Sequence, residues 1–130
     1  MDKQLSMKNS QFDIKKRTFQ FALDTLKCCK QIVEHEKEYI LSKQLSRSAT
    51  SVGANVREAQ NAISKADFVH KLSIAQKECD ESGYWIELLI AYIETENLEL
   101  NRLLNESNEL LKILSSIIIK TKENNSQIKR

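Results

Sequence analysis

The chain has 130 residues and a formal net charge of +2, which is enough for one domain and too close to neutral to mark the whole chain as a polyanion binder. It has no proline and only two glycines, a composition that disfavours sheets with tight turns and favours long helices with short links. The three cysteines are a poor disulfide framework, no apolar run approaches the ~20 residues that cross a bilayer, and the polar N-terminus does not resemble a secretory signal. We therefore expect a cytoplasmic protein without a membrane partner.

Residues 1–11 are polar and unpatterned, and we expect them to form a flexible N-terminus. From about residue 12 to 35 apolar residues recur at steps of three and four, which predicts a first helix. Its predicted core stripe is Phe19, Leu23, Leu26, Cys29 or Lys30, and Val33, widened on one side by Phe21, Cys28 and Ile32.

The stretch SRSATSVGANVREAQNA, residues 46–62, is rich in small and polar residues. It is either a binding loop or part of a helix whose face admits another backbone. A near-heptad seam runs through it and favours a helix from about 38 to 62: Leu41, Leu45, Ala49, Val52, Val56, Ala59 and Ile63. Gly53 costs such a helix about 1 kcal/mol relative to Ala, which implies a packing reason. We predict close helix packing at Ala49 and Gly53.

Ser64, followed by Asp67, resembles a capping box that starts a third helix, and Thr95 or Asn97 can cap a fourth. The third helix has the most regular seam: Phe68, Leu72, Ala75, Cys79, Ser82, Ile86, Leu89 and Ile93. The fourth continues the same period: Leu100, Leu104, Ser107, Leu111, Leu114 and Ile118. Residues 121–130 are polar and are expected to form a flexible C-terminal tail.

Four amphipathic helices with short links predict an all-α, antiparallel, up-down-up-down four-helix bundle over residues 12–120. The second and third helices also carry a second heptad-spaced line, which a helix with one partner does not need. We expect this line to be an oligomer interface or an embedded polar network in which Arg47 pairs with Glu58 or Glu81; the alternative is a solvated face. Its members are Gln44, Arg47, Ser51, Asn55, Glu58, Glu78, Glu81 and Trp85.

The segments LSKQLSRSATSVGANVREAQ (41–60) and DFVHKLSIAQKECDESGYWIELL (67–89) resemble the four-helix-bundle proteins of the 23S ribosomal RNA intervening-sequence family. The matching positions are Gln44, Arg47, Ser48, Ser51, Asn55, Glu58, Phe68, Ile74, Ala75 and Glu81. Ala59 and Gln60 depart from the family's Glu-Gly, which bears only on where the second helix ends. The resemblance implies a homo-oligomer, a pentameric ring, without an assigned activity. A distant relative, the accessory protein of diversity-generating retroelements, is a basic pentamer that binds nucleic acid.

Residue types that carry catalysis or metal binding are scattered. His35 and His70 are isolated, and the sequence has no Cys-x-x-Cys or Glu-x-x-His spacing, so we predict neither a metal nor another cofactor. Cys79 lies on the core seam of the third helix, and no serine lies in a glycine-rich turn between a strand and a helix. We predict that the protein is not an enzyme.

Basic residues gather modestly on the first helix and near the chain's end, and the alternative for them is an ordinary solvated surface. A five-membered ring would repeat each weak patch about five times and so raise its avidity. The candidate phosphate contacts are Lys15, Lys16, Arg17, Lys27, Lys30, Lys120 and Lys122. We therefore predict a non-enzymatic, homo-oligomeric accessory protein that binds RNA or DNA; the alternative is a protein-protein interaction scaffold without nucleic-acid binding.

Overall fold

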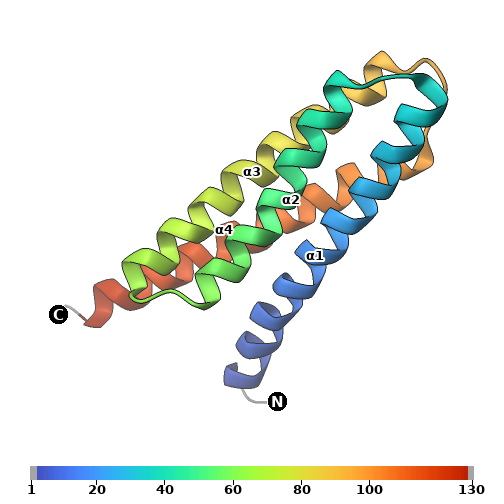
Figure 1. Ribbon diagram of the computed structural model, residues 1–130. Helices are drawn as coiled ribbons and strands as arrows, with labels where there is room; N and C mark the ends of the chain where they lie inside the picture. Colours follow the sequence, from blue (N-terminus) through green and yellow to red (C-terminus); the bar gives the residue numbers. More distant parts are fainter. Residues whose placement is uncertain (1–2, 129–130) are drawn as a thin grey trace.

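The computed structural model describes the backbone of residues 3–128 and the side chains of residues 14–124. The helices in this range are α1 (Lys3–Glu36), α2 (Ile40–Gln60), α3 (Lys65–Tyr92) and α4 (Leu98–Ile128). Successive helices run in opposite directions and are linked at alternating ends of the molecule, which confirms the four-helix bundle (Figure 1). Helices α1 and α4 extend into both ends expected to be flexible, 1–11 and 121–130, which lie partly outside the described residues, so that expectation stays a prediction.

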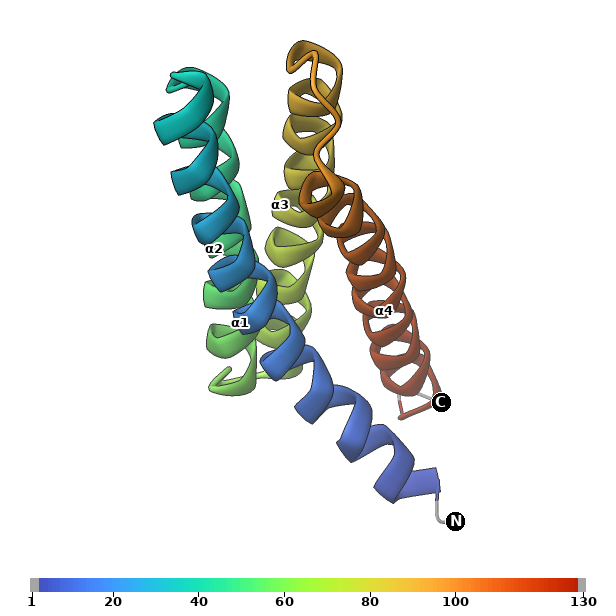
Figure 2. The ribbon, with the colours of Figure 1, turned by 90° about the vertical axis from the view of Figure 1, so that its right-hand side faces the viewer.

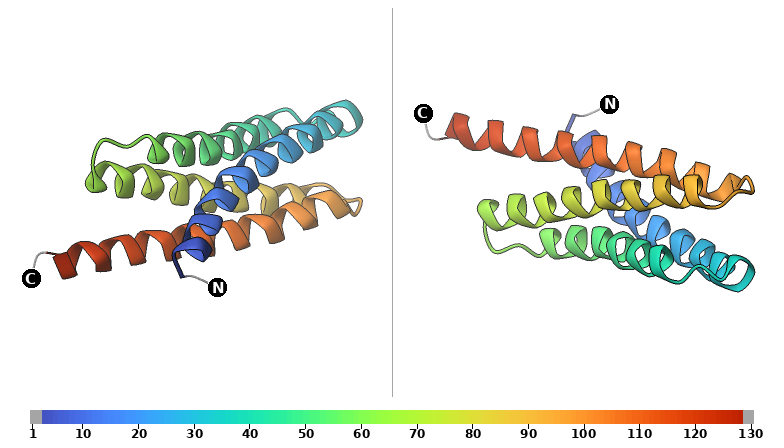
Figure 3. Two further views of the ribbon diagram at one scale, coloured as in Figure 1. Left: turned by 90° about the horizontal axis from the view of Figure 1, so that it is seen from below. Right: turned by 90° about the horizontal axis from the view of Figure 1, so that it is seen from above.

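The four helices do not pack equally. Helix α2 packs most extensively against α3, and the contact between α1 and α4 is the smallest of the four helix-helix contacts. Figure 2 and Figure 3 show the reason: α1 lies along α2 near the α1–α2 link, then turns away from α2 and crosses α4 obliquely. Helices α1 and α3 do not contact each other over the described residues, so they occupy opposite corners of the bundle.

The link between α1 and α2 is set by two neighbouring residues. Lys37 adopts a left-handed backbone conformation, with φ of 56°, and ends α1. The Glu38 carboxylate then accepts hydrogen bonds from the backbone N–H groups of Ile40, Leu41 and Ser42, at 3.1, 3.0 and 2.8 Å. Burial opposes ionisation of Glu38, but these backbone hydrogen bonds outweigh it and lower the pKa of the carboxyl below its ordinary value of 4.5. Glu38 therefore caps α2 as an anion.

The caps of α3 and α4 agree with the sequence. The Ser64 hydroxyl accepts a hydrogen bond from the backbone N–H of Asp67 at 3.0 Å, which confirms the predicted start of α3. At α4 the side-chain oxygen of Asn97 accepts from the backbone N–H of Leu100 at 3.0 Å. Of the two predicted caps for α4, the structure therefore uses Asn97 and not Thr95.

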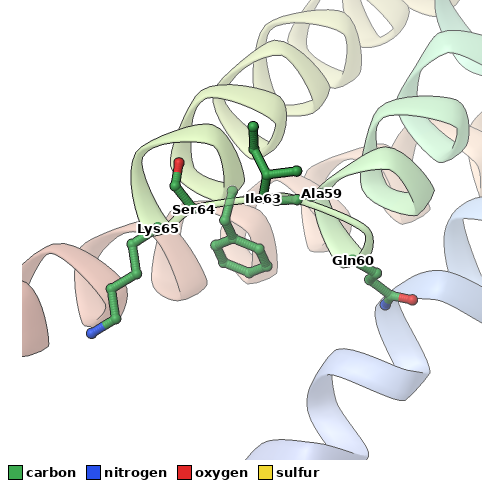
Figure 4. A pocket seen from close by; sticks show the side chains of 7 residues that line it. Ala59, Gln60, Ile63, Ser64 and Lys65 are labelled. Carbon is green, nitrogen blue, oxygen red and sulfur yellow. The ribbon is translucent and has the colours of Figure 1, made fainter.

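The core seams of α2 and α3 are confirmed almost throughout. Residues of the α2 seam are buried from Leu45 to Ala59, and those of the α3 seam from Leu72 to Ile93. The prediction that Ile63 belongs to the core seam is wrong. Because α2 ends at Gln60, this side chain lies in the link, points out of the bundle and is 95% exposed (Figure 4). In α4 the buried positions are Leu100, Leu103, Ser107, Leu110, Leu114 and Ile118, so Leu103 and Leu110 replace the predicted Leu104 and Leu111.

The predicted core stripe of α1 is wrong at Phe19 and Leu26, which are 56% and 43% exposed. Among the side chains of α1 that the structure describes, from residue 14 on, the buried ones are Ile14, Thr18, Phe21, Thr25, Cys28, Cys29 and Ile32. The cause lies in α2: a Cβ atom on Gly53 would be 3.3 Å from the carbonyl oxygen of Thr18. The backbone of α1 approaches α2 at this glycine with its Thr18 side inward, and this contact turns Phe19 and Leu26 outward.

Candidate assembly and binding surfaces

The line of residues predicted as an interface or polar network lies along the junction of α2 and α3 within one chain. At its centre, a guanidinium nitrogen of Arg47 donates to Glu81 at 2.9 Å, and another lies 3.6 Å from a carboxylate oxygen of Glu78. The Glu81 oxygen that accepts from Arg47 also accepts from the indole nitrogen of Trp85 at 3.4 Å. Arg47 therefore joins α2 to two carboxylates of α3, and Glu81 was one of its two predicted partners.

Beneath this cluster two serine hydroxyls meet in the core. The Ser82 hydroxyl lies 3.0 Å from that of Ser48 and 2.8 Å from the carbonyl oxygen of Glu78, and both serines are fully buried. Their small side chains let α2 and α3 approach closely, and their polar atoms have partners within the helix pair. Glu78 lies between the two groups: its backbone carbonyl accepts from Ser82, and its carboxylate faces Arg47 without a hydrogen bond to its buried Oε2.

The other members of the predicted line make local contacts. Glu58, the second candidate partner for Arg47, instead pairs with Lys71 of α3 at 3.0 Å. The Asn55 amide donates to the carbonyl oxygen of Ser51 at 2.8 Å, within α2. Gln44 is half-buried and has no hydrogen-bond partner among the described side chains. A second copy covering the outer edge of this line stays a prediction.

The two residues predicted for close helix packing lie on the side of α2 that faces away from the network. Ala49 is fully buried in the core. Gly53 is the point where the backbone of α1 comes closest, as the contact with Thr18 shows. At the other helical glycine, Gly83, a Cβ atom would meet only the Ser107 hydroxyl, at 3.5 Å, which is an ordinary contact. Close backbone approach is therefore a property of Gly53 and not of both glycines.

A groove of about 530 Å³ opens outside this contact, between α1 and α2. We call it the α1–α2 groove; its apolar walls and floor are Phe19, Ala22, Leu23, Leu26, Gly53 and Ala54. Lys15 and Arg57 line the same end of it, because α1 and α2 are antiparallel. Neither cation has an ion-pair partner among the side chains that the structure describes. Sequence reasoning missed this groove because it assigned Phe19 and Leu26 to the core.

Most of the predicted phosphate contacts lie at the surface. Exposed members of the set are Lys16, Lys27, Lys30, Lys120 and Lys122, and Lys15 is half-buried in the groove. Arg17 differs, because its guanidinium binds both carboxylate oxygens of Glu106 on α4. Arg102 likewise joins α4 to α1 through Asp24 at 2.9 Å, and its hydrogen bonds to Glu99 and Asp24 raise the pKa of the guanidinium further above its ordinary value. Arg17 therefore belongs to the attachment of α1 to α4.

The cysteines and histidines are placed unlike catalytic groups. All three cysteines are buried, and burial raises the pKa of the Cys28 and Cys79 thiols to about 12. These thiols are protonated at neutral pH and are poor nucleophiles. His35 and His70 are both exposed, and over the described residues no three His, Cys, Asp or Glu side chains gather where they could share a metal ion. No helix within the described range is long and apolar enough to span a bilayer.

The comparisons with known proteins agree with this architecture. A family model described as 23S rRNA-intervening sequence protein matches residues 10–116, from the first helix into the fourth. The chain belongs to this family. The match confirms the resemblance seen in the second and third helices and extends it to most of the bundle.

A solved structure supports the same assignment. The chain is similar to a protein of unknown function from the S23 ribosomal protein family of Bacteroides thetaiotaomicron, with 42% sequence identity and a TM-score of 0.80. The similarity covers 84% of this chain and 97% of that one. No curated protein matches the chain. Neither the family's description nor that of the Bacteroides protein names a catalytic activity.

Proposed function

We propose that this family member is a non-enzymatic assembly protein whose copies associate into a ring that presents lysines to RNA or DNA. The observation that carries the proposal is the rotation of α1, which buries Thr18 and Thr25 and leaves Phe19 and Leu26 on the surface. The orientation buries Phe21. Two large apolar side chains on one exposed face of a helix are typical of a surface that a partner covers.

The orientation of α1 has a cost in free energy for the single chain. Full burial of a Phe or Leu side chain is worth roughly 1.5–3 kcal/mol, of which the chain alone gains only part at Phe19 and Leu26. The hydroxyl of Thr25 is buried without a hydrogen-bond partner, which costs roughly 1–3 kcal/mol. A second molecule on the α1–α2 groove would recover the first of these losses. Self-association therefore accounts for the exposure of Phe19 and Leu26.

Exposed lysines support the proposed binding of RNA or DNA. Lys27, Lys30 and Lys120 are exposed, and their ammonium groups can meet phosphates without a change in the fold. A ring of five copies, which the family resemblance implies, would repeat each weak contact about five times and raise the avidity. Phosphate contacts of this kind tolerate any sequence and weaken steeply as salt is added.

One observation favours the alternative, a protein-binding scaffold without nucleic-acid binding. Arg17 is engaged with Glu106 of α4, so one of the predicted phosphate contacts is committed within the chain. On this alternative the α1–α2 groove and the ring remain, and the exposed lysines only solvate the surface.

Sedimentation equilibrium of the full chain over a range of concentrations tests the assembly. We expect a mass that is a multiple of the 15.0 kDa chain, and a 15.0 kDa species at every concentration would remove the proposal.

Fluorescence anisotropy with a labelled single-stranded RNA and a labelled DNA duplex tests the second half. We expect binding that falls by an order of magnitude or more between about 50 and about 200 mM salt. The double variant Lys27→Glu/Lys30→Glu should bind more weakly. The control is Lys77→Glu on α3, which makes the same change of charge at a site outside the predicted phosphate contacts and should bind like the unchanged chain. An assembled protein that binds neither probe at low salt would leave the scaffold as the function.

A further inference from the structure

We infer that the α1–α2 groove of one copy receives a ridge on the outer face of α3 of the next copy. We call this the α3 ridge and define it as Asp80, Tyr84 and Glu87. The inference rests on the proposed self-association and names the two surfaces that would make it. These surfaces differ from the polar line between α2 and α3, which the sequence predicts as an oligomer interface or an embedded polar network.

The α3 ridge is a preformed aromatic projection. Its three residues follow at steps of four and three, so they share one face of α3, and Tyr84 is 57% exposed. The Tyr84 ring meets the Trp85 ring edge-on, with centroids 5.0 Å apart and an angle of 68° between the planes. Glu81 in turn accepts a hydrogen bond from the indole of Trp85. A ring held in this way loses little conformational freedom when it inserts into a partner.

The charges of the two surfaces are complementary. Asp80 and Glu87 flank the tyrosine, and neither has an ion-pair partner among the described residues. Lys15 and Arg57, at one end of the groove, also lack one. Glu58 lines the groove too, but its carboxylate is paired with Lys71 of α3. The difference in charge between the two surfaces also holds for the whole helices that carry them. Helices α1 and α2 contain ten Lys and Arg against five Asp and Glu, and α3 contains three against five.

The shape of the groove fits an inserted ring. Gly53 and Ala54 give it a floor without long side chains, and Phe19 forms an exposed aromatic wall. An inserted tyrosine would pack on Phe19 and cover Leu26, the two side chains that the single chain leaves exposed. The volume of about 530 Å³ leaves room for the tyrosine and its flanking helical turn.

The positions of the two surfaces determine the kind of assembly. The groove involves α1, and α1 and α3 occupy opposite corners of the bundle. In a two-fold dimer, each copy would have to present both its groove and its ridge to the same neighbour. Because the two surfaces face different sides of the bundle, such a dimer cannot form through them. The contact is head-to-tail, which closes into a ring when the rotation between neighbours allows it.

A mixing experiment tests the pairing of groove and ridge. Phe19→Asp places an acid in the groove, and Tyr84→Asp removes the aromatic ring of the ridge; both residues are exposed, so the bundle should remain folded. Each variant alone is expected to sediment as a 15.0 kDa monomer where the unchanged chain assembles. Each retains one intact surface, so an equimolar mixture is expected to form a one-to-one complex. Tyr92→Asp, at another exposed tyrosine of α3, is the control and should assemble as the unchanged chain does.

The possible results separate the inference from the proposed function. A mixture that stays monomeric, or a Tyr84→Asp variant that assembles like the unchanged chain, overturns the pairing while the assembly itself stands. An unchanged chain that is monomeric removes both. If circular dichroism shows that Phe19→Asp unfolds, the charge-reversed groove Lys15→Glu/Arg57→Glu replaces it. Its assembly should be lost and then regained when Asp80→Lys/Glu87→Lys is added to the same chain, and absence of rescue overturns the pairing.

Discussion

Helix α2 meets α3 on one side and α1 on the other, and the two junctions bury different kinds of side chain. Towards α3 it presents a regular apolar seam with a polar cluster around Ser48, whose hydroxyl meets that of Ser82. Towards α1 it presents Gly53, against which the backbone at Thr18 packs. The first junction is specified by many side chains in register, and the second combines the buried side chains of α1 with a close backbone approach at Gly53. With Thr18 packed against Gly53, α1 buries Phe21 and leaves Phe19 and Leu26 at the surface.

The largest expected effect concerns Gly53. In Gly53→Leu the Cβ atom already lies 3.3 Å from the Thr18 carbonyl oxygen, and the rest of the side chain has to displace α1. We expect the free energy of unfolding to fall by about 3 kcal/mol. The matched control is Gly83→Ala, where the added Cβ meets only a hydroxyl at 3.5 Å and helix propensity should add about 0.5–1 kcal/mol. Urea denaturation measures both, and equal stability of Gly53→Leu and the unchanged chain would contradict the close approach.

A pair of threonine variants tests the face that α1 turns inward. Thr25→Val removes a buried hydroxyl without a partner and should stabilise the protein by about 1 kcal/mol. Thr18→Val removes a hydroxyl that donates to the Ile14 carbonyl oxygen at 2.7 Å and should destabilise it by about 1 kcal/mol. Opposite signs in thermal or urea unfolding are the expected result. If both substitutions stabilised the protein equally, the two sites would not differ as the structure indicates.

Glu38 tests the link that aligns α1 with α2. Its folded pKa is lowered, so its contribution to stability is present above its unfolded pKa, near 4.5, and is lost as pH falls through the lower folded pKa. Glu38→Gln should cost about 1 kcal/mol at pH 7 and much less at pH 3. Urea midpoints at the two pH values measure this, and a cost that is independent of pH would show that the carboxylate charge is not used.

The smallest effect is expected from the ion pair on the α2–α3 junction. Arg47 is half-exposed, so a double-mutant cycle of Arg47→Ala and Glu81→Ala should give a coupling of about 0.5 kcal/mol. The pair would then fix the register of α2 on α3 more than it adds stability. A coupling above about 2 kcal/mol would mean that this junction depends on electrostatics and not on its apolar seam.

Much of the bundle could be predicted because its signals are local. The α3 seam repeats over the whole helix, and the Ser64–Asp67 cap is visible from two residues. The orientation of α1 could not be predicted, because Phe19 and Phe21 both belong to stripes with helical spacing. The contact that decides between them involves a backbone oxygen, which leaves no side-chain pattern. Gly53 signalled a close approach but not which helix made it.

The candidate surfaces, too, could be predicted from the sequence only in part. Spacing alone suggested that Arg47 could reach Glu81, because the two lie on facing lines of α2 and α3. The pairing of Glu58 with Lys71 was missed, since it depends on how far α2 and α3 are offset along their axes. The α1–α2 groove was missed because it exists only when Phe19 faces outward.

The orientation of α1 can be measured directly by thiol labelling of Phe19→Cys and Phe21→Cys, in protein dilute enough to be monomeric. The three native cysteines are buried and give little background. The account predicts that Cys at position 19 is labelled at least about two orders of magnitude faster than Cys at position 21, which has to wait for local opening. The opposite order, with position 21 reactive and position 19 protected in the monomer, would contradict it.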